Sequence, residues 1–202
     1  MSGMMANQVA TQYKVLLIYH GAALESSQKL FEALGSQAGI QLRVLAPRRG
    51  YNPFRKAILE NSETSYAQYE LVTGRVYRAM RDYSGPYVSG LWREIVRFRP
   101  DVIHVFNEAY SKIHLQTLLY KLISQPRAKC FCHGVENLIP PNPASWRQKL
   151  RRQFIHRYSD GATCWSTSAK DALALAGFPL AKLYVTYWGI PLTAFSPARN
   201  AA

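Results

Sequence analysis

Three short polar segments of the sequence carry side chains that could bind or act on a small molecule. They are His20-Gly21, Asn107-Glu108 and His133-Gly134-Val135-Glu136. An imidazole can hydrogen-bond a hydroxyl group or move a proton near neutral pH, and carboxylate and amide groups can also bind hydroxyls. Each segment alone is more often an ordinary polar turn that caps the next helix. The three together favour a binding site.

Each polar segment follows a short apolar run that is typical of a buried strand, namely 14–19, 101–106 and 128–132. Longer amphipathic runs at 24–34, 110–124 and 146–158 separate these strands and predict helices. This alternation predicts βαβ units and a Rossmann-like α/β domain, a parallel sheet with helices on both faces. Ligands of such sheets bind outside the carboxyl ends of the strands, where helix N-termini favour anions. The polar segments fall at those ends.

The rest of the chain completes this pattern with one weak region. Strands are expected at 41–46, ended by Pro47, and at 162–164 and 184–187, with helices at 87–98 and 168–176. The basic segment 48–56 contains glycine and proline and predicts an exposed loop. Segment 57–83 has a mostly helical pattern without clear breaks.

The sequence Cys130-Phe131-Cys132-His133 contains residue types that bind metals. Strand alternation sends Cys130 and Cys132 to one face of the sheet and His133 to the other, and no second ligand pair matches them. Buried free cysteine is common. We therefore expect no metal site and no bound cofactor.

The segment 146–158 predicts a basic amphipathic helix, with Trp146, Leu150 and Phe154 on one side. Its cations could contact an anionic lipid surface; the four candidates are Arg147, Lys149, Arg151 and Arg152. The ordinary alternative, an apolar stripe packed on the sheet with cations in water, is favoured, and the two are compatible. The basic segment 48–56 also contains aromatic residues, as single-stranded nucleic-acid sites do. No complete nucleic-acid motif accompanies it, so we expect no nucleic-acid partner.

Composition sets broader limits on the class of protein. The chain has 202 residues, 48% of them hydrophobic, enough for one sizeable core. Twenty-five Lys and Arg against 12 Asp and Glu give a formal charge of +13, which favours anionic partners. Three cysteines do not suggest a disulfide framework, and neither a secretory signal nor a membrane-spanning run is recognised. A cytoplasmic protein is expected, with peripheral attachment at the inner face of the membrane left open.

The order of several motifs resembles the N-terminal domain of group 1, family 4-like glycosyltransferases with the GT-B fold. The motifs are Pro100–Val105, His133-Gly134, Ser159–Ser168, and the closing Gly189-Ile190-Pro191 with Phe195-Ser196-Pro197. Each is weak alone, and their order is the specific signal. The resemblance implies a tail at 1–13, an acceptor-side domain at 14–188, and a hinge at 189–202 toward a separate or missing C-terminal donor domain.

The resemblance also implies an activity. The expected function is transfer of a sugar from a nucleotide-sugar donor to a glycan or lipid-linked acceptor, with retention of configuration and no metal. His133 matches the family histidine beside the transferred sugar, so it is the catalytic candidate. His20, Gly21, Asn107, Glu108, Gly134 and Glu136 are expected to line the cleft. An isolated acceptor-side domain would be inactive.

A second hypothesis belongs to another class of protein. The chain could be a non-catalytic α/β module that binds a protein partner or an anionic surface through its basic loop and helix. For His133 itself the alternative to a place beside the transferred sugar is a structural role, as a cap of the following turn.

Overall fold

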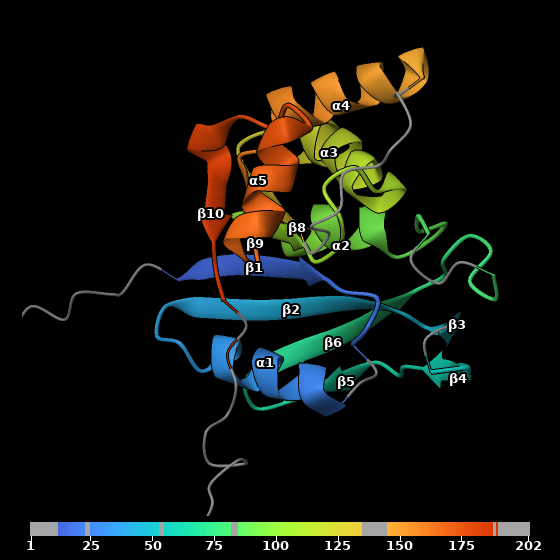
Figure 1. Ribbon diagram of the computed structural model, residues 1–202. Coiled ribbons are helices and arrows are strands. Elements are labelled where there is room, and N and C mark those ends of the chain that lie inside the picture. Colours follow the sequence, from blue (N-terminus) through green and yellow to red (C-terminus); the bar gives the residue numbers. More distant parts are fainter. Residues whose placement is uncertain are drawn as a thin grey trace, which may run out of the picture.

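The apolar runs form a largely parallel sheet in a computed structural model that describes residues 12–22, 25–52, 55–81, 85–134, 145–187 and 189 (Figure 1). Its eight strands lie in the order β10-β9-β8-β7-β1-β2-β6-β5. The strands are β1 (Tyr13–Ile18), β2 (Ile40–Pro47), β5 (Thr64–Ser65), β6 (Tyr69–Gly74), β7 (Val102–Val105), β8 (Lys129–Gly134), β9 (Gly161–Cys164) and β10 (Leu183–Val185). Every neighbouring pair is parallel except β5 and β6.

Helices cover both faces of this sheet, as the sequence predicted. They are α1 (Glu25–Gly35), α2 (Leu91–Phe98), α3 (Lys112–Ser124), α4 (Trp146–Tyr158) and α5 (Thr167–Leu175), and a short 3-10 turn, Leu180–Lys182, precedes β10. Figure 1 shows α1 on one face of the sheet and α2 to α5 on the other. The predicted Rossmann-like α/β class is therefore confirmed.

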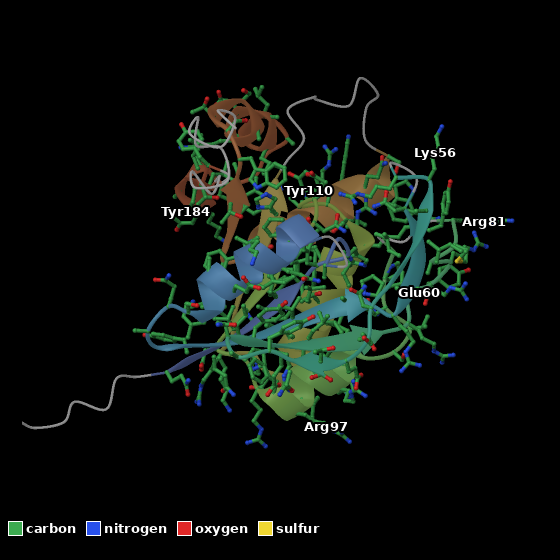
Figure 2. All side chains as sticks on the ribbon, turned by 90° about the horizontal axis from the view of Figure 1, so that it is seen from below. Lys56, Glu60, Arg81, Arg97, Tyr110 and Tyr184 are labelled. Atoms are coloured by element: carbon green, nitrogen blue, oxygen red, sulfur yellow. The ribbon has the colours of Figure 1, made fainter. Side chains whose placement is uncertain are left out.

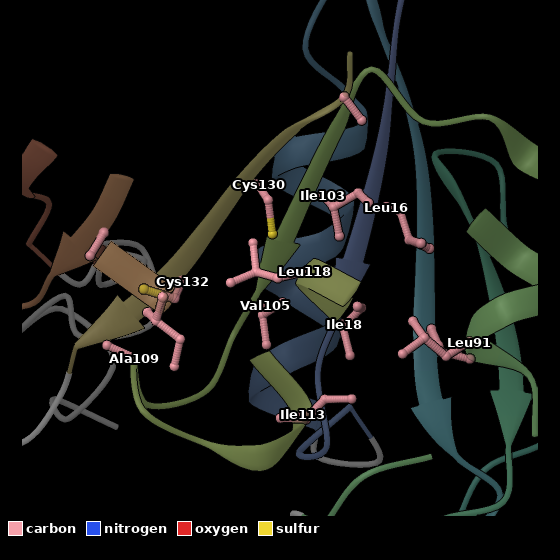
Figure 3. Close-up of a cluster of buried hydrophobic side chains, with 14 of the residues drawn as sticks. Leu16, Ile18, Leu91, Ile103, Val105, Ala109, Ile113, Leu118, Cys130 and Cys132 are labelled. Atoms are coloured by element: carbon pink, nitrogen blue, oxygen red, sulfur yellow. The ribbon is translucent and has the colours of Figure 1, made fainter. Parts of the chain in front are cut away.

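The core divides into two clusters because successive strand residues point to opposite faces. Leu16 and Ile18 of β1 pack with α2 and α3 in the larger cluster, which also holds Cys130 and Cys132 (Figure 3). Leu17, between them, packs in the smaller cluster around α1. A fully buried leucine or isoleucine contributes about 1.5–3 kcal/mol. Apolar burial on both faces thus fixes the register of the central strands.

The direction of chain progression across the sheet reverses between β1 and β7. From β1 the chain runs outward through β2 to β6, and from β7 it runs the other way through β8 and β9 to β10. Such a reversal leaves a crevice at the carboxyl ends of the two central strands, where ligands of open α/β sheets bind. In this fold the reversal falls between β1 and β7, so a ligand is expected beside the loops that follow these two strands.

Two sequence-based expectations are wrong. The basic segment 48–56 is not simply a loop, because β3 (Arg49–Asn52) pairs antiparallel with β4 (Ala57–Glu60). Segment 57–83 is not helical in its described part, which contains β4, β5, β6 and turns. In Figure 2, Lys56, Glu60 and Arg81 lie at this hairpin end of the molecule, far from Tyr184. Strand β6 is stabilised by pairing with β2 along its whole length, a contact that local sequence cannot reveal.

Candidate functional site

The parallel sheet brings three of the predicted polar segments to one edge. β1 pairs with β7, and β7 pairs with β8, so their carboxyl ends are neighbours. His20 follows β1, Asn107 follows β7, and His133 is in the last two residues of β8. Glu136 lies outside the described residues. The described members of the predicted site therefore flank the reversal point of the sheet.

His133 is held among aromatic rings and is only 2% exposed. The ring of Phe106 stacks on it with 4.3 Å between centroids and 14° between planes, and Trp165 meets it edge-on at 4.8 Å. The Nδ1 atom of His133 lies 2.7 Å from Oγ1 of Thr163. Its Nε2 atom is buried and has no hydrogen-bond partner among the described residues. One edge of the imidazole is thus anchored, while the other is buried without a hydrogen-bond partner among the described residues.

The environment keeps this imidazole neutral. Burial, together with the nearby ring of His104, lowers the pKa of His133 from its usual value near 6.5 to about 3. The backbone N–H of His133 donates to the carbonyl of Asn107 at 3.1 Å, which ties the end of β8 to the β7 turn. At neutral pH His133 can accept or donate a hydrogen bond but does not act as a fixed cation.

Two residues that sequence reasoning did not assign to the site lie against His133. Nε2 of His104, in β7, is 3.2 Å from Oγ1 of Thr163, in β9, so both histidines contact one hydroxyl. Thr163 is the register partner of His133 across the β8–β9 pair. The sequence alone gives no sign that Thr163 contacts His133, because the contact depends on the register of β8 and β9. His104 could have been noticed in the sequence as a polar residue inside an apolar strand.

His20 and Gly21 form structural contacts at the end of β1. Nε2 of His20 lies 3.1 Å from the carbonyl oxygen of Gly85, and its ring is 5.3 Å from that of Tyr87. A Cβ atom at Gly21 would come within 2.8 Å of the Tyr19 ring, so a side chain there requires that ring to move. These contacts shape the first loop of the site.

Asn107 and Glu108 form the turn that leads from β7 into α3. Oδ1 of Asn107 accepts the backbone N–H of Glu108 at 2.8 Å, and the carbonyl of Glu108 accepts the N–H of Ser111 at 3.0 Å. Ser111 is the N-cap of α3, where its hydroxyl accepts the N–H of His114. The amide of Asn107 therefore also has a turn-forming role, as the ordinary interpretation expects.

Gly134 gives the end of β8 room beside α5. A Cβ atom at Gly134 would lie 2.7 Å from Cδ1 of Leu173 and 3.6 Å from Sγ of Cys164. Its carbonyl accepts the backbone N–H of Trp165 at 3.3 Å, and this hydrogen bond holds Trp165 beside β8. Gly134 thus helps to position the aromatic wall around His133.

Helix α4 only partly follows the favoured expectation of an apolar stripe packed on the domain. Ile155 is its buried residue and Phe154 packs against the larger core, but Trp146 is 66% and Leu150 56% exposed. Arg147 and Lys149 are exposed beside them. The expectation of a fully packed stripe is wrong at the N-terminal half of α4, because that half extends beyond its contact with the domain (Figure 1).

The other two candidate cations of α4 are half-buried. The guanidinium of Arg152 lies 4.9 Å from the centre of the Tyr110 ring, close enough for a cation–π interaction, and Arg151 is likewise partly covered. Arg151 and Arg152 therefore lie nearer the body of the domain than Arg147 and Lys149.

The three cysteines are buried in the larger core cluster, so Cys130 and Cys132 do point away from His133. Within the described part of the chain, no group of three or more potential ligands could hold a metal ion. No helix in that same part is long and apolar enough to cross a membrane.

The reversal of the sheet and the helices on both faces define a Rossmann-like domain with the fold of the N-terminal domain of GT-B proteins. The model of Glycosyltransferase Family 4 matches residues 28–194, most of the chain, and the chain belongs to this family. No curated protein matches the sequence.

Solved structures with a similar fold include enzymes of nucleotide-sugar chemistry. HepE from Anabaena, in complex with UDP and glucose, is 13% identical with a TM-score of 0.53 over 93% of this chain and 48% of its own. UDP-N-acetylglucosamine 2-epimerase from Rickettsia bellii is 10% identical with a TM-score of 0.52, over 95% and 49%. The Neisseria meningitidis UDP-GlcNAc 2-epimerase, bound to UDP-GlcNAc, is 14% identical with a TM-score of 0.50, over 86% and 45%. The chain spans about half the length of these proteins.

Proposed function

We propose that this chain is the acceptor-side domain of a glycosyltransferase that transfers a sugar from a nucleotide-sugar donor to a glycan or lipid-linked acceptor. The observation that carries the proposal is His133, a neutral imidazole with an unpartnered Nε2 among the described residues, at the sheet edge of a Glycosyltransferase Family 4 chain. A neutral imidazole there can hydrogen-bond a hydroxyl of the transferred sugar. Transfer with retention of configuration and without a metal is part of this proposal.

The donor would be held mainly by a second domain. Family resemblance assigns the nucleotide to a C-terminal donor domain, and the proteins of similar fold are about twice the length of this chain. Exposed Tyr184 and Tyr187, at and just after β10, offer apolar surface near the proposed hinge. The proposal is that both halves are needed for transfer.

A transfer assay tests the proposal. The chain is incubated alone and with a separately made donor-domain polypeptide, with labelled UDP- and GDP-sugars and extracted membrane lipids and glycans as acceptors. We expect label to enter an acceptor only when both halves are present. His133→Ala should lower the rate by about tenfold, the effect of losing one hydrogen bond to the sugar. Absence of transfer in every mixture, or an unchanged rate in His133→Ala, would contradict it.

A matched control separates the site from general damage. His156→Ala removes another histidine, whose Nε2 lies 2.8 Å from the Tyr110 hydroxyl and whose ring packs against Phe178 on the α4 side of the domain. Its transfer rate should stay close to wild type once both variants are shown to be folded.

The exposed half of α4 supports a second part of the proposal, contact with an anionic membrane at its cytoplasmic face. Trp146 and Leu150 offer apolar surface, and Arg147 and Lys149 surround it with positive charge. Each such cation near an anionic surface is worth about 1 kcal/mol, and an aromatic ring suits the interface between headgroups and lipid chains. A lipid-linked acceptor would then be met at the membrane.

Sedimentation with vesicles tests this contact. The chain should bind vesicles that contain phosphatidylglycerol more tightly than those of phosphatidylcholine alone. The double variant Arg147→Ala/Lys149→Ala should lose about 2 kcal/mol, or roughly 30-fold in affinity. Arg97→Ala, on the exposed face of α2 (Figure 2), and Leu180→Ala, at a residue that is 64% exposed, are controls. Equal binding to both vesicle types would reject the membrane contact. The non-catalytic alternative would then need a protein partner.

A further inference from the structure

A single hydroxyl group connects three strands beside the candidate catalytic residue. Oγ1 of Thr163 lies 2.7 Å from Nδ1 of His133, 3.2 Å from Nε2 of His104 and 3.4 Å from the carbonyl oxygen of Cys132. These groups come from β9, β8 and β7. The hydroxyl has one proton to donate and two lone pairs to accept with.

Counting protons limits how these contacts can be made. The carbonyl of Cys132 can only accept, so if the hydroxyl donates to it, both ring nitrogens must donate to Thr163. In that arrangement the hydroxyl makes three contacts, and the proton of His133 is on Nδ1. A hydroxyl that donates to Nε2 of His104 can still accept from Nδ1–H of His133, so the proton of His133 stays on Nδ1. Only a hydroxyl that donates to Nδ1 of His133 places the histidine proton on Nε2.

The two tautomers of His133 differ in the group that is left unpaired at Nε2. Nε2 of His133 is buried without a partner among the described residues. A buried N–H donor without a partner is rarer than a buried acceptor whose lone pair has no partner. The first arrangement, with the proton on Nδ1, leaves only a lone pair at Nε2.

We propose that Thr163, supported by His104, is a positioning residue that holds His133 in the Nδ1–H tautomer and presents Nε2 as a hydrogen-bond acceptor. Phe106 stacks on the imidazole and restricts its rotation, so the ring cannot readily exchange its two nitrogens. Resting on the proposed function, the inference specifies the ligand group at this position: it is a hydrogen-bond donor, such as a sugar hydroxyl. A ligand group that can only accept would be disfavoured.

The tautomer itself can be measured without any ligand. Long-range nitrogen–proton NMR of the chain labelled with nitrogen-15 histidine distinguishes a protonated from an unprotonated ring nitrogen. At neutral pH the wild type should show the proton on Nδ1 of His133. Thr163→Ser keeps the hydroxyl and should preserve that tautomer, whereas Thr163→Val removes it with little change of shape and should give a mixture. A proton on Nε2 in the wild type, or an unchanged spectrum in Thr163→Val, would overturn the inference.

A functional readout accompanies the spectroscopic one. In the complete transfer mixture Thr163→Val should lose about tenfold in rate, the effect of one hydrogen bond, and Thr163→Ser should recover most of it. If the tautomer behaves as expected but no mixture transfers sugar, the proposed function fails and the inference about Thr163 stands. If transfer occurs with the proton on Nε2, the inference alone fails. Amide spectra that match the wild type at positions away from β9 establish that Thr163→Val is folded; Thr163→Ser carries the test if it is not.

Discussion

Asp160 should stabilise the fold by joining the start of β8 to the turn that precedes β9. Its carboxylate accepts the backbone N–H of Cys130 at 2.9 Å and the ammonium of Lys129 at 2.9 Å, and Lys121 lies 4.0 Å away. This contact adjoins the β8–β9 pairing, in which His133 is opposite Thr163. Asp160→Asn therefore tests a part of the fold that positions the site.

The magnitude follows from these three contacts. A hydrogen bond from a backbone N–H to a charged group contributes about 1.5–3 kcal/mol. The Lys129 pair adds little because the Lys129 side chain is exposed to solvent, which screens the pair. The amide of asparagine keeps one acceptor oxygen but loses the charge. We expect Asp160→Asn to lower the free energy of unfolding by about 1–3 kcal/mol at pH 7.

The same contacts predict how this loss depends on pH. Burial by itself raises the pKa of Asp160, but the Cys130 N–H and the two lysines outweigh it, so the pKa is lowered. A carboxyl with a lowered folded-state pKa contributes its stability above its unfolded value, about 3.9, and loses it as the pH falls through the folded value. The difference between wild type and Asp160→Asn should therefore shrink below about pH 4.

Urea denaturation followed by circular dichroism, at pH 7 and in steps below pH 4, measures both effects. Asp171→Asn is the matched control, because Asp171 is an exposed carboxylate on α5 and its substitution should change stability by less than about 0.5 kcal/mol. A stability of Asp160→Asn equal to wild type at pH 7, or a deficit that persists unchanged in acid, would contradict this role of Asp160.

Three further outcomes are expected. Gly35→Ala should destabilise the protein by about 1–2 kcal/mol, because the added Cβ would lie 2.1 Å from the carbonyl oxygen of Gln68. This clash outweighs the better helix propensity of alanine. Thermal unfolding measures the loss, and Gly189→Ala is the control, because an added Cβ there has nothing within 4 Å. Burial lowers the pKa of His114 to about 4, so the unfolded chain binds this proton at a higher pH than the folded chain does. The free energy of unfolding should therefore fall as the pH drops from about 6.5 to 4. In urea titrations His114→Gln should make this pH dependence shallower, and an unchanged slope would contradict the prediction. Trp146→Ala should change the free energy of unfolding by less than about 0.5 kcal/mol, because the Trp146 side chain is 66% exposed. A larger loss in urea denaturation would mean that this ring packs against the rest of the domain.

The central strands and α4 could be predicted because their signals are local. Strand β1 ends in an apolar run that is buried on both faces, and β7 buries Ile103 and Val105 on one face. The predicted helix 146–158 matches α4 because Ser145 and Gln148 form a capping box at its start. Such patterns need no knowledge of distant partners.

The hairpin β3–β4 and strand β6 could not be predicted in the same way. Strand β4 is largely exposed, and the buried residues of β3 are Gly50 and Asn52, so neither strand has an apolar periodicity. In β6, Glu70 forms an ion pair with Arg43 of β2, which in turn pairs with Glu94 of α2 at 3.1 Å. These polar residues obscure a strand whose stability comes from long-range pairing.

Part of the candidate site followed from the sequence for a topological reason. Parallel strands place their carboxyl ends at one edge, so His20, Asn107 and His133 could be expected there before the register was known. The contact of Thr163 with both histidines depends on the pairing of β9 with β8 and on side-chain geometry. Spacing along the chain contains no such information.

The most direct test of a ligand site at this edge is amide NMR of the labelled chain, alone and mixed with the donor-domain polypeptide, during titration with UDP-glucose. Shift changes should concentrate at or just after the ends of β1, β7, β8 and β9, at residues 20–21, 106–108, 133–134 and 163–165. Changes confined to the β3–β4 hairpin or to α4, or no change in either sample, would contradict a nucleotide-sugar site at the carboxyl ends of these strands.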